Sequence, residues 1–103
     1  MSNIRIRAQS RDGVTTVRCL ITHEMETGLR KDEATGGRVP ADFIQEVHAT
    51  WNDQKVLNTY WSGGISTDPY ISFKFNGGAA GDTIHFTWVD NQGVTETTTA
   101  TIS

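Results

Sequence analysis

Apolar and polar side chains alternate with a period of two residues in this sequence, and the alternation restarts about seven times along it. It is clear over residues 4–9, where Ile, Ile and Ala alternate with Arg, Arg and Gln, and again over residues 84–89. Successive side chains of a β-strand point to opposite faces, so this period is typical of strands with one buried face. No segment shows the 3.6-residue period of an amphipathic helix. The pattern therefore predicts an all-β fold.

Turn residues separate the alternating segments about every 8–12 residues, the spacing expected of a β-sandwich. Asp12-Gly13 is typical of a tight hairpin turn, because Asp and Gly tolerate positive φ. We therefore expect the first two strands to form a hairpin, and the last, Thr-rich strand to lie at a sheet edge. The expected strands cover residues 4–9, 14–22, 43–51, 56–61, 70–75, 84–89 and 94–102. In the third strand, the alternation assigns one face to Phe43, Gln45, Val47, Ala49 and Trp51.

Length and charge limit the kinds of protein this can be. The 103 residues are enough for one domain with one core, without metal or disulfide staples, and we treat residues 1–103 as that domain. The formal net charge of -3 argues against nucleic acid or an anionic membrane as the natural partner. Apolar stretches are too short to span a bilayer. The first residues show no signal-peptide pattern.

The segment 23–40 breaks the alternation and is the most unusual part of the sequence. It is long, charged and interrupted by glycines, and connections of this length are often functional. Its carboxylates could supply a general acid and base, but Arg and Lys lie among them, so mutual screening on a solvated loop is the favoured interpretation. Met and Arg are enriched in interface cores. We therefore predict a partner interface here, with candidate residues His23, Met25, Glu26, Leu29, Arg30 and Val39.

No motif in the sequence predicts catalysis. The three histidines show no metal-ligand spacing, and few soft ligands are present, so we expect no metal site. The run Gly77–Gly81 lacks the Lys-Ser/Thr and the following helix of a phosphate-binding loop, and no GxSxG elbow occurs. We expect no catalytic residue and no cofactor.

Cys19 raises an alternative hypothesis, in which the chain is a small thiol-dependent enzyme or carrier. It lies between Val17 and Ile21 on the expected inward face of a strand, where a cysteine usually acts as a small hydrophobe. A thiol-dependent enzyme or carrier would need this thiol exposed in an electropositive setting. Rapid alkylation of the native protein would favour that alternative, and alkylation only after denaturation would exclude it.

Several runs of the sequence resemble the SoxZ family, the small subunits of the SoxYZ sulfur-carrier complexes of bacterial thiosulfate oxidation. The most specific run is His23–Asp32, His-Glu-Met-Glu-Thr-Gly-Leu-Arg-Lys-Asp. Similar matches follow in the same order along nearly the whole chain, at residues 66–75, 80–82 and 86–90. Three positions depart from the family pattern: Glu24 and Asp68, where Pro and Asn are usual, and Cys19, where a small apolar residue is usual.

The resemblance implies an immunoglobulin-like β-sandwich that pairs with a SoxY-type subunit. In that family SoxY carries sulfur intermediates covalently on a cysteine near its C-terminus, and other pathway enzymes load, oxidise and release them. The small subunit has no known catalytic residue. The resemblance also implies a periplasmic location, reached by export together with a signal-bearing partner, and transient contacts with the other thiosulfate-oxidation enzymes.

Two further possibilities remain open from the sequence. The chain could be a freestanding adhesive or structural sandwich, which would be stable alone and would bind no carrier partner. The isolated chain could also form a homo-oligomer through the surface meant for its partner, so self-association alone would not distinguish these hypotheses.

Overall fold

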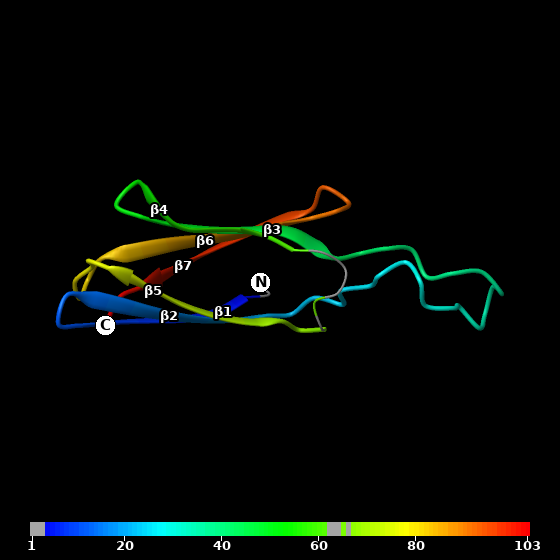
Figure 1. Ribbon diagram of the computed structural model, residues 1–103, viewed down its shortest axis with the longest axis horizontal. Coiled ribbons are helices and arrows are strands. Elements are labelled where there is room, and N and C mark those ends of the chain that lie inside the picture. The colour runs from blue at the N-terminus through cyan, green and yellow to red at the C-terminus, as the bar shows by residue number, and fades with distance from the viewer. Residues whose placement is uncertain (1–3, 62–64, 66) are drawn as a thin grey trace.

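Seven antiparallel strands form two sheets that pack face to face in the computed structural model of the chain (Figure 1). The structure describes residues 4–61, 65 and 67–103. No helix in this described part is long and apolar enough to cross a membrane. The strands are β1 (Ile4–Arg11), β2 (Val14–Ile21), β3 (Ile44–Trp51), β4 (Gln54–Tyr60), β5 (Tyr70–Asn76), β6 (Thr83–Asp90) and β7 (Thr95–Thr101). The all-β prediction is confirmed.

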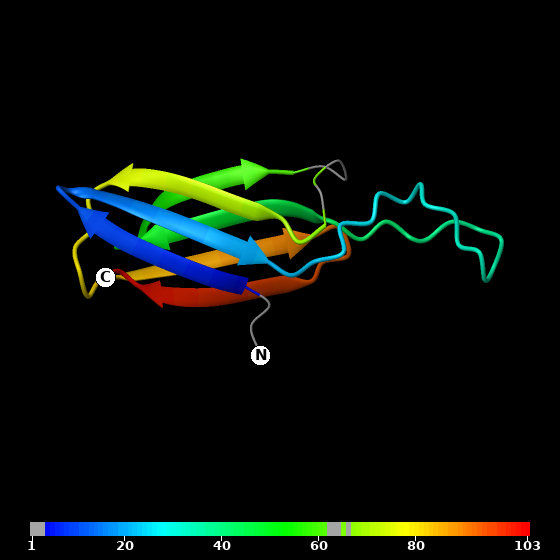
Figure 2. The same ribbon diagram turned by 90° about the horizontal axis from the view of Figure 1, so that it is seen from below.

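The strand order is β1-β2-β5 in one sheet and β4-β3-β6-β7 in the other. Three hairpins, β1–β2, β3–β4 and β6–β7, stay within a sheet, whereas the other connections cross between sheets. Two antiparallel sheets with this kind of crossover connectivity make an immunoglobulin-like sandwich, as expected. β7 lies at an edge, also as expected, and the chain end beyond it bonds to β1 (Figure 2), where Ser103 N donates to Ala8 O at 3.0 Å.

Two tight turns set the register of their hairpins. Asp12 and Gly13 have φ of 54° and 79°, and Asn52 and Asp53 have φ of 53° and 61°. Two successive residues with positive φ match the twist of antiparallel strands, so each hairpin closes on two residues. For this reason β4 begins at Gln54, two residues earlier than expected. The loop expected over residues 63–69 lies partly outside the described residues.

The core lies between the sheets, and the alternation predicts most of it. In β6, Ile84, Phe86 and Trp88 are buried, as their spacing indicates. The face expected for the third strand is wrong at its start: Ile44 is buried, while Gln45 is exposed. A register shift between Ile44 and Glu46 places an extra residue in β3, and such a bulge moves the following side chains to the opposite face.

Residues 22–43, which connect β2 to β3, leave the sandwich as a long irregular hairpin that we call the arm. It extends away from one end of both sheets (Figures 1 and 2). The principal extents of the molecule are 55 × 22 × 18 Å. The segment that breaks the sequence pattern is therefore a projection with its own backbone pairing and lies outside the sheets.

Candidate functional site: the arm and its base

Backbone hydrogen bonds hold the two sides of the arm together. Near the sandwich, Glu26 and Asp42 exchange both backbone hydrogen bonds, at 2.7 and 3.0 Å. Farther from the sandwich, Asp32 N donates to Gly37 O at 2.8 Å, and Val39 N donates to Arg30 O at 2.8 Å. These bonds give the arm a defined path, although no regular strand forms in it.

The projecting part of the arm, residues 26–40, which we call its tip, presents an exposed apolar side chain next to an ion pair. Leu29 is 71% exposed and is among the large hydrophobic residues that the described surface displays. Arg30 donates from Nε and Nη2 to Glu26 Oε1, at 3.0 and 2.8 Å, and hydrogen bonding to Glu26 raises the pKa of Arg30. An exposed leucine beside a charge-assisted pair resembles the mixture of apolar and Arg contacts at protein interfaces.

Met25 belongs to the base of the arm and is part of the core. It is 5% exposed, and its Sδ accepts a hydrogen bond from Ile44 N at 3.3 Å. Its φ is 54°, an uncommon value for a residue with a side chain. The chain turns sharply at this position, and the thioether fills the end of the sandwich. Met25 therefore anchors the arm, and its side chain is not on the surface of the isolated chain.

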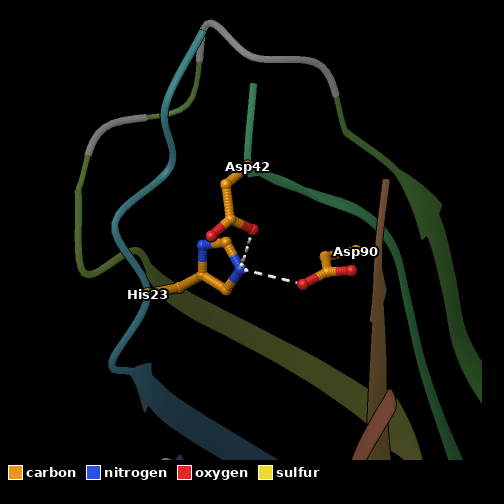
Figure 3. Close-up of side chains that lie close together, drawn as sticks. All are labelled: His23, Asp42 and Asp90. Carbon is orange, nitrogen blue, oxygen red and sulfur yellow. Dashed lines mark ion pairs between the residues drawn. The ribbon is translucent and has the colours of Figure 1, made fainter. Parts of the chain in front are cut away.

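His23 occupies the same end of the sandwich, between two carboxylates from different segments (Figure 3). Its side chain is 7% exposed, and Nε2 lies 3.5 Å from Asp42 Oδ1 and 3.5 Å from Asp90 Oδ2. The ring packs edge-on against Trp88, with 5.1 Å between ring centroids. Nδ1 accepts a hydrogen bond from Met25 N at 3.1 Å. We call His23, Asp42 and Asp90 the clasp.

The clasp ties three segments together where the arm begins. His23 follows β2, Asp42 precedes β3, and Asp90 ends β6. Asp90 is 3% exposed, and its Oδ1 accepts hydrogen bonds from Gln92 N and Val94 N, both at 2.9 Å, which shapes the β6–β7 turn. Its other oxygen faces His23. One buried carboxylate thus orders a turn and orients the imidazole at the base of the arm.

The three clasp side chains offer ligand atoms within 4.8 Å of one another, a spacing that could suit a divalent cation. The hydrogen bonding of the His23 imidazole argues against metal binding and favours a direct contact with the carboxylates. Because Nδ1 accepts the Met25 N–H, the neutral ring carries its hydrogen on Nε2, directed toward the carboxylates. A histidine that binds a metal through Nε2 must carry its hydrogen on Nδ1 instead. The clasp as built is therefore an imidazole–carboxylate contact, and the absence of a metal site stays a prediction.

The structure divides the six candidate interface residues between the base and the projecting part of the arm. His23 and Met25 lie inside the base, whereas Glu26, Leu29, Arg30 and Val39 lie along the arm. No pattern in the sequence predicts Asp42 and Asp90 as partners of His23. Each stands next to a strand end, but they are 19 and 67 positions from His23 in sequence, and no local spacing relates them.

Cys19 is buried in β2, with no exposed surface. Burial raises the pKa of its thiol to about 12. A thiolate is the reactive form of cysteine, so this thiol lacks both the exposure and the ionisation that a carrier or nucleophile needs. The structure gives Cys19 the role of a core side chain.

Comparison with protein families identifies the chain more closely. Residues 4–101 match the family model described as "Sulphur oxidation protein SoxZ". The chain belongs to the SoxZ family. No curated protein matches it. The match covers the seven strands and the whole arm, so the clasp and the exposed Leu29 lie within the matched region.

Proposed function

We propose that this SoxZ-family chain is the non-catalytic subunit of a heterodimeric sulfur carrier of thiosulfate oxidation. In this role it stabilises and presents a SoxY-type subunit, which holds the sulfur intermediates covalently. The observation that carries the proposal is the family match over residues 4–101. The burial of Cys19 supports the division of labour, because the carrier thiol must then come from the partner.

We assign the partner interface to the projecting part of the arm. Leu29 and Arg30 are exposed there, and a projection can reach a second subunit without disturbing the sandwich. His23 and Met25 support this surface from beneath by fixing the base of the arm. The exposed apolar side chain would be the anchor, and the Glu26–Arg30 pair would lie at the rim.

The test is co-purification of the tagged chain with the SoxY-type subunit from cells grown on thiosulfate, followed by intact mass measurement. A partner that carries extra sulfur mass supports the proposal. Recovery of the chain alone, at low and high salt, contradicts it and leaves the freestanding sandwich as the better hypothesis. Leu29→Asp should weaken the complex, whereas Tyr60→Asp is a matched control, because Tyr60 on β4 is 72% exposed.

Alkylation tests the alternative in which Cys19 is the working thiol. Native protein should react no faster than it unfolds, and denatured protein should react at once. Fast labelling of the native chain at pH 8 would contradict the carrier-subunit proposal.

We place the complex in the periplasm and infer that the chain is exported together with its signal-bearing partner. Deletion of the partner gene should then leave the chain in the cytoplasmic fraction. Periplasmic recovery without the partner would disprove shared export.

The assembled carrier would contact the other thiosulfate-oxidation enzymes only transiently. The isolated chain should self-associate more than the complex does, which size-exclusion chromatography can measure.

A further inference from the structure

The outer face of the sheet β1-β2-β5 has an ordered arrangement of side chains that the arm does not explain. The strand register sets three rows across it, and we call them together the basic face. The rows are Arg5, Leu20 and Tyr70; then Arg7, Arg18 and Ser72; then Gln9, Thr16 and Lys74. All but the half-buried Thr16 are exposed.

This face gathers positive charge in a chain whose net charge is -3. Strands β1, β2 and β5 contain no Asp or Glu. They contain five of the nine Lys and Arg residues of the chain, namely Arg5, Arg7, Arg11, Arg18 and Lys74. None of the five forms an ion pair within the described part of the chain. Arg7 and Arg18 lie directly opposite each other, an arrangement that destabilises an isolated sheet.

Apolar surface lies within the same charges. Leu20 is 42% exposed and Tyr70 is 60% exposed, and the two are cross-strand neighbours. Together with the three arginine side chains they line an open hollow of about 250 Å³, with Cys19 beneath them. Arginine stems cover apolar surface while their charged ends stay in water. Arg and Tyr are among the residue types enriched at the energetic centres of protein interfaces, so the lining of this hollow is typical of an anchor site.

We propose that the basic face docks the acidic surface of a second protein, which inserts an exposed apolar side chain between Leu20 and Tyr70. Carboxylates of that protein pair with Arg7 and Arg18 and remove their mutual repulsion. This interface goes beyond the proposed function and does not depend on the identity of the carrier subunit. It lies on a sheet face, whereas the arm projects from the end of the sandwich (Figure 1).

The positive charge of the basic face favours an acidic protein over the other possible partners. A second copy of the chain related by a two-fold axis would place the same cations against each other, so the face cannot pair with itself. Nucleic acid and anionic membranes attract basic surfaces, but the rest of this chain is acidic and would repel them. The three rows span only about 14 by 10 Å of backbone, less than a permanent interface needs. The contact is therefore weak and salt-dependent.

The test uses the isolated chain and a fluorescein-labelled peptide of Asp and Glu residues with a central Phe-Leu pair. Fluorescence anisotropy should show binding that weakens steeply between about 50 and 200 mM NaCl. The double variant Arg7→Gln/Arg18→Gln should weaken binding at least about tenfold. The matched control Lys31→Gln/Arg38→Gln removes two exposed charges from the arm and should leave binding within about twofold. Leu20→Ser should weaken binding without changing its salt dependence.

Two results would overturn the proposal. Equal binding of a peptide in which Ser replaces the Phe-Leu pair would show a general attraction for polyanions. Tighter binding to phosphatidylglycerol vesicles than to the peptide, lost in the same double variant, would reassign the face to a membrane. Arg7, Arg18 and Leu20 lie on an exposed face. Neither Arg7→Gln/Arg18→Gln nor Leu20→Ser should therefore unfold at a lower temperature than the parent chain, which separates lost binding from lost folding.

Discussion

The base and the tip of the arm come from one charged, glycine-containing stretch of sequence, yet they differ in what surrounds their side chains. At the base, Met25 and His23 are packed into the end of the sandwich and bonded to neighbouring segments. Farther out, Leu29 is 71% exposed. One continuous segment can thus be part of the core at one end and an exposed surface at the other. Substitutions in it should therefore separate stability from binding.

The largest effect is expected at the base. Met25→Asp places a carboxylate among Ile44 and other buried side chains and removes the acceptor of the Ile44 N–H. A buried unpaired charge and a lost core side chain should lower the free energy of unfolding by about 3–5 kcal/mol. Urea denaturation followed by tryptophan fluorescence measures the change.

Met25→Leu is the control for that experiment, because it nearly conserves volume and should cost less than about 1.5 kcal/mol. A loss below about 1 kcal/mol for Met25→Asp would contradict the anchor role. Loss of partner binding in Met25→Asp alone would say nothing about the interface, because the variant loses stability first.

Substitution in the clasp should cause the second largest loss of stability. Asp90→Ala removes the acceptor of the Gln92 and Val94 backbone N–H groups and one of the two carboxylates beside His23. Buried hydrogen bonds to a charged group contribute about 1.5–3 kcal/mol, so we expect a loss of about 2–3 kcal/mol in thermal or urea unfolding. Asp90→Asn keeps one acceptor oxygen and should cost less. Equal losses in the two variants would show that the charge beside His23 matters more than the turn.

The sequence predicts features that depend on neighbouring residues, but not features that depend on tertiary packing. The alternation in β6 and the Asp12-Gly13 turn depend on neighbours in the chain, and both expectations are confirmed. The β3 bulge was not predicted, because one extra residue shifts the face without a distinct residue type. The clasp was not predicted either, because Asp42 and Asp90 meet His23 only through tertiary packing. Exposure of Leu29 and burial of Met25 likewise follow from where the arm leaves the sandwich.

On the basic face we expect a smaller change, and one that raises the free energy of unfolding. Like the tip of the arm, this face is exposed in the isolated chain. Arg18→Gln removes one member of a like-charged cross-strand pair that no carboxylate of the described chain neutralises. Cross-strand pairs change stability by about 0.2–1 kcal/mol, so the variant should be up to about 0.5 kcal/mol more stable at low salt. The gain should shrink as salt rises. A loss of stability would mean that the Arg18 stem contributes packing that outweighs the repulsion.

The smallest effect on folding is expected at the tip, and there the comparison with the base is tested most directly. Leu29→Asp changes a side chain that is already in solvent, so the free energy of unfolding should stay within about 0.5 kcal/mol of the parent value. If the arm contacts the carrier subunit, the same variant should lose affinity for it by an order of magnitude or more, because an interfacial anchor becomes a charge. Urea denaturation and a titration against the partner subunit measure the two quantities on one preparation. Unchanged affinity with unchanged stability would remove the tip from the interface while leaving the base as a structural anchor. A large loss of stability would instead show that base and tip fold as one cooperative unit, and the distinction between them would fail.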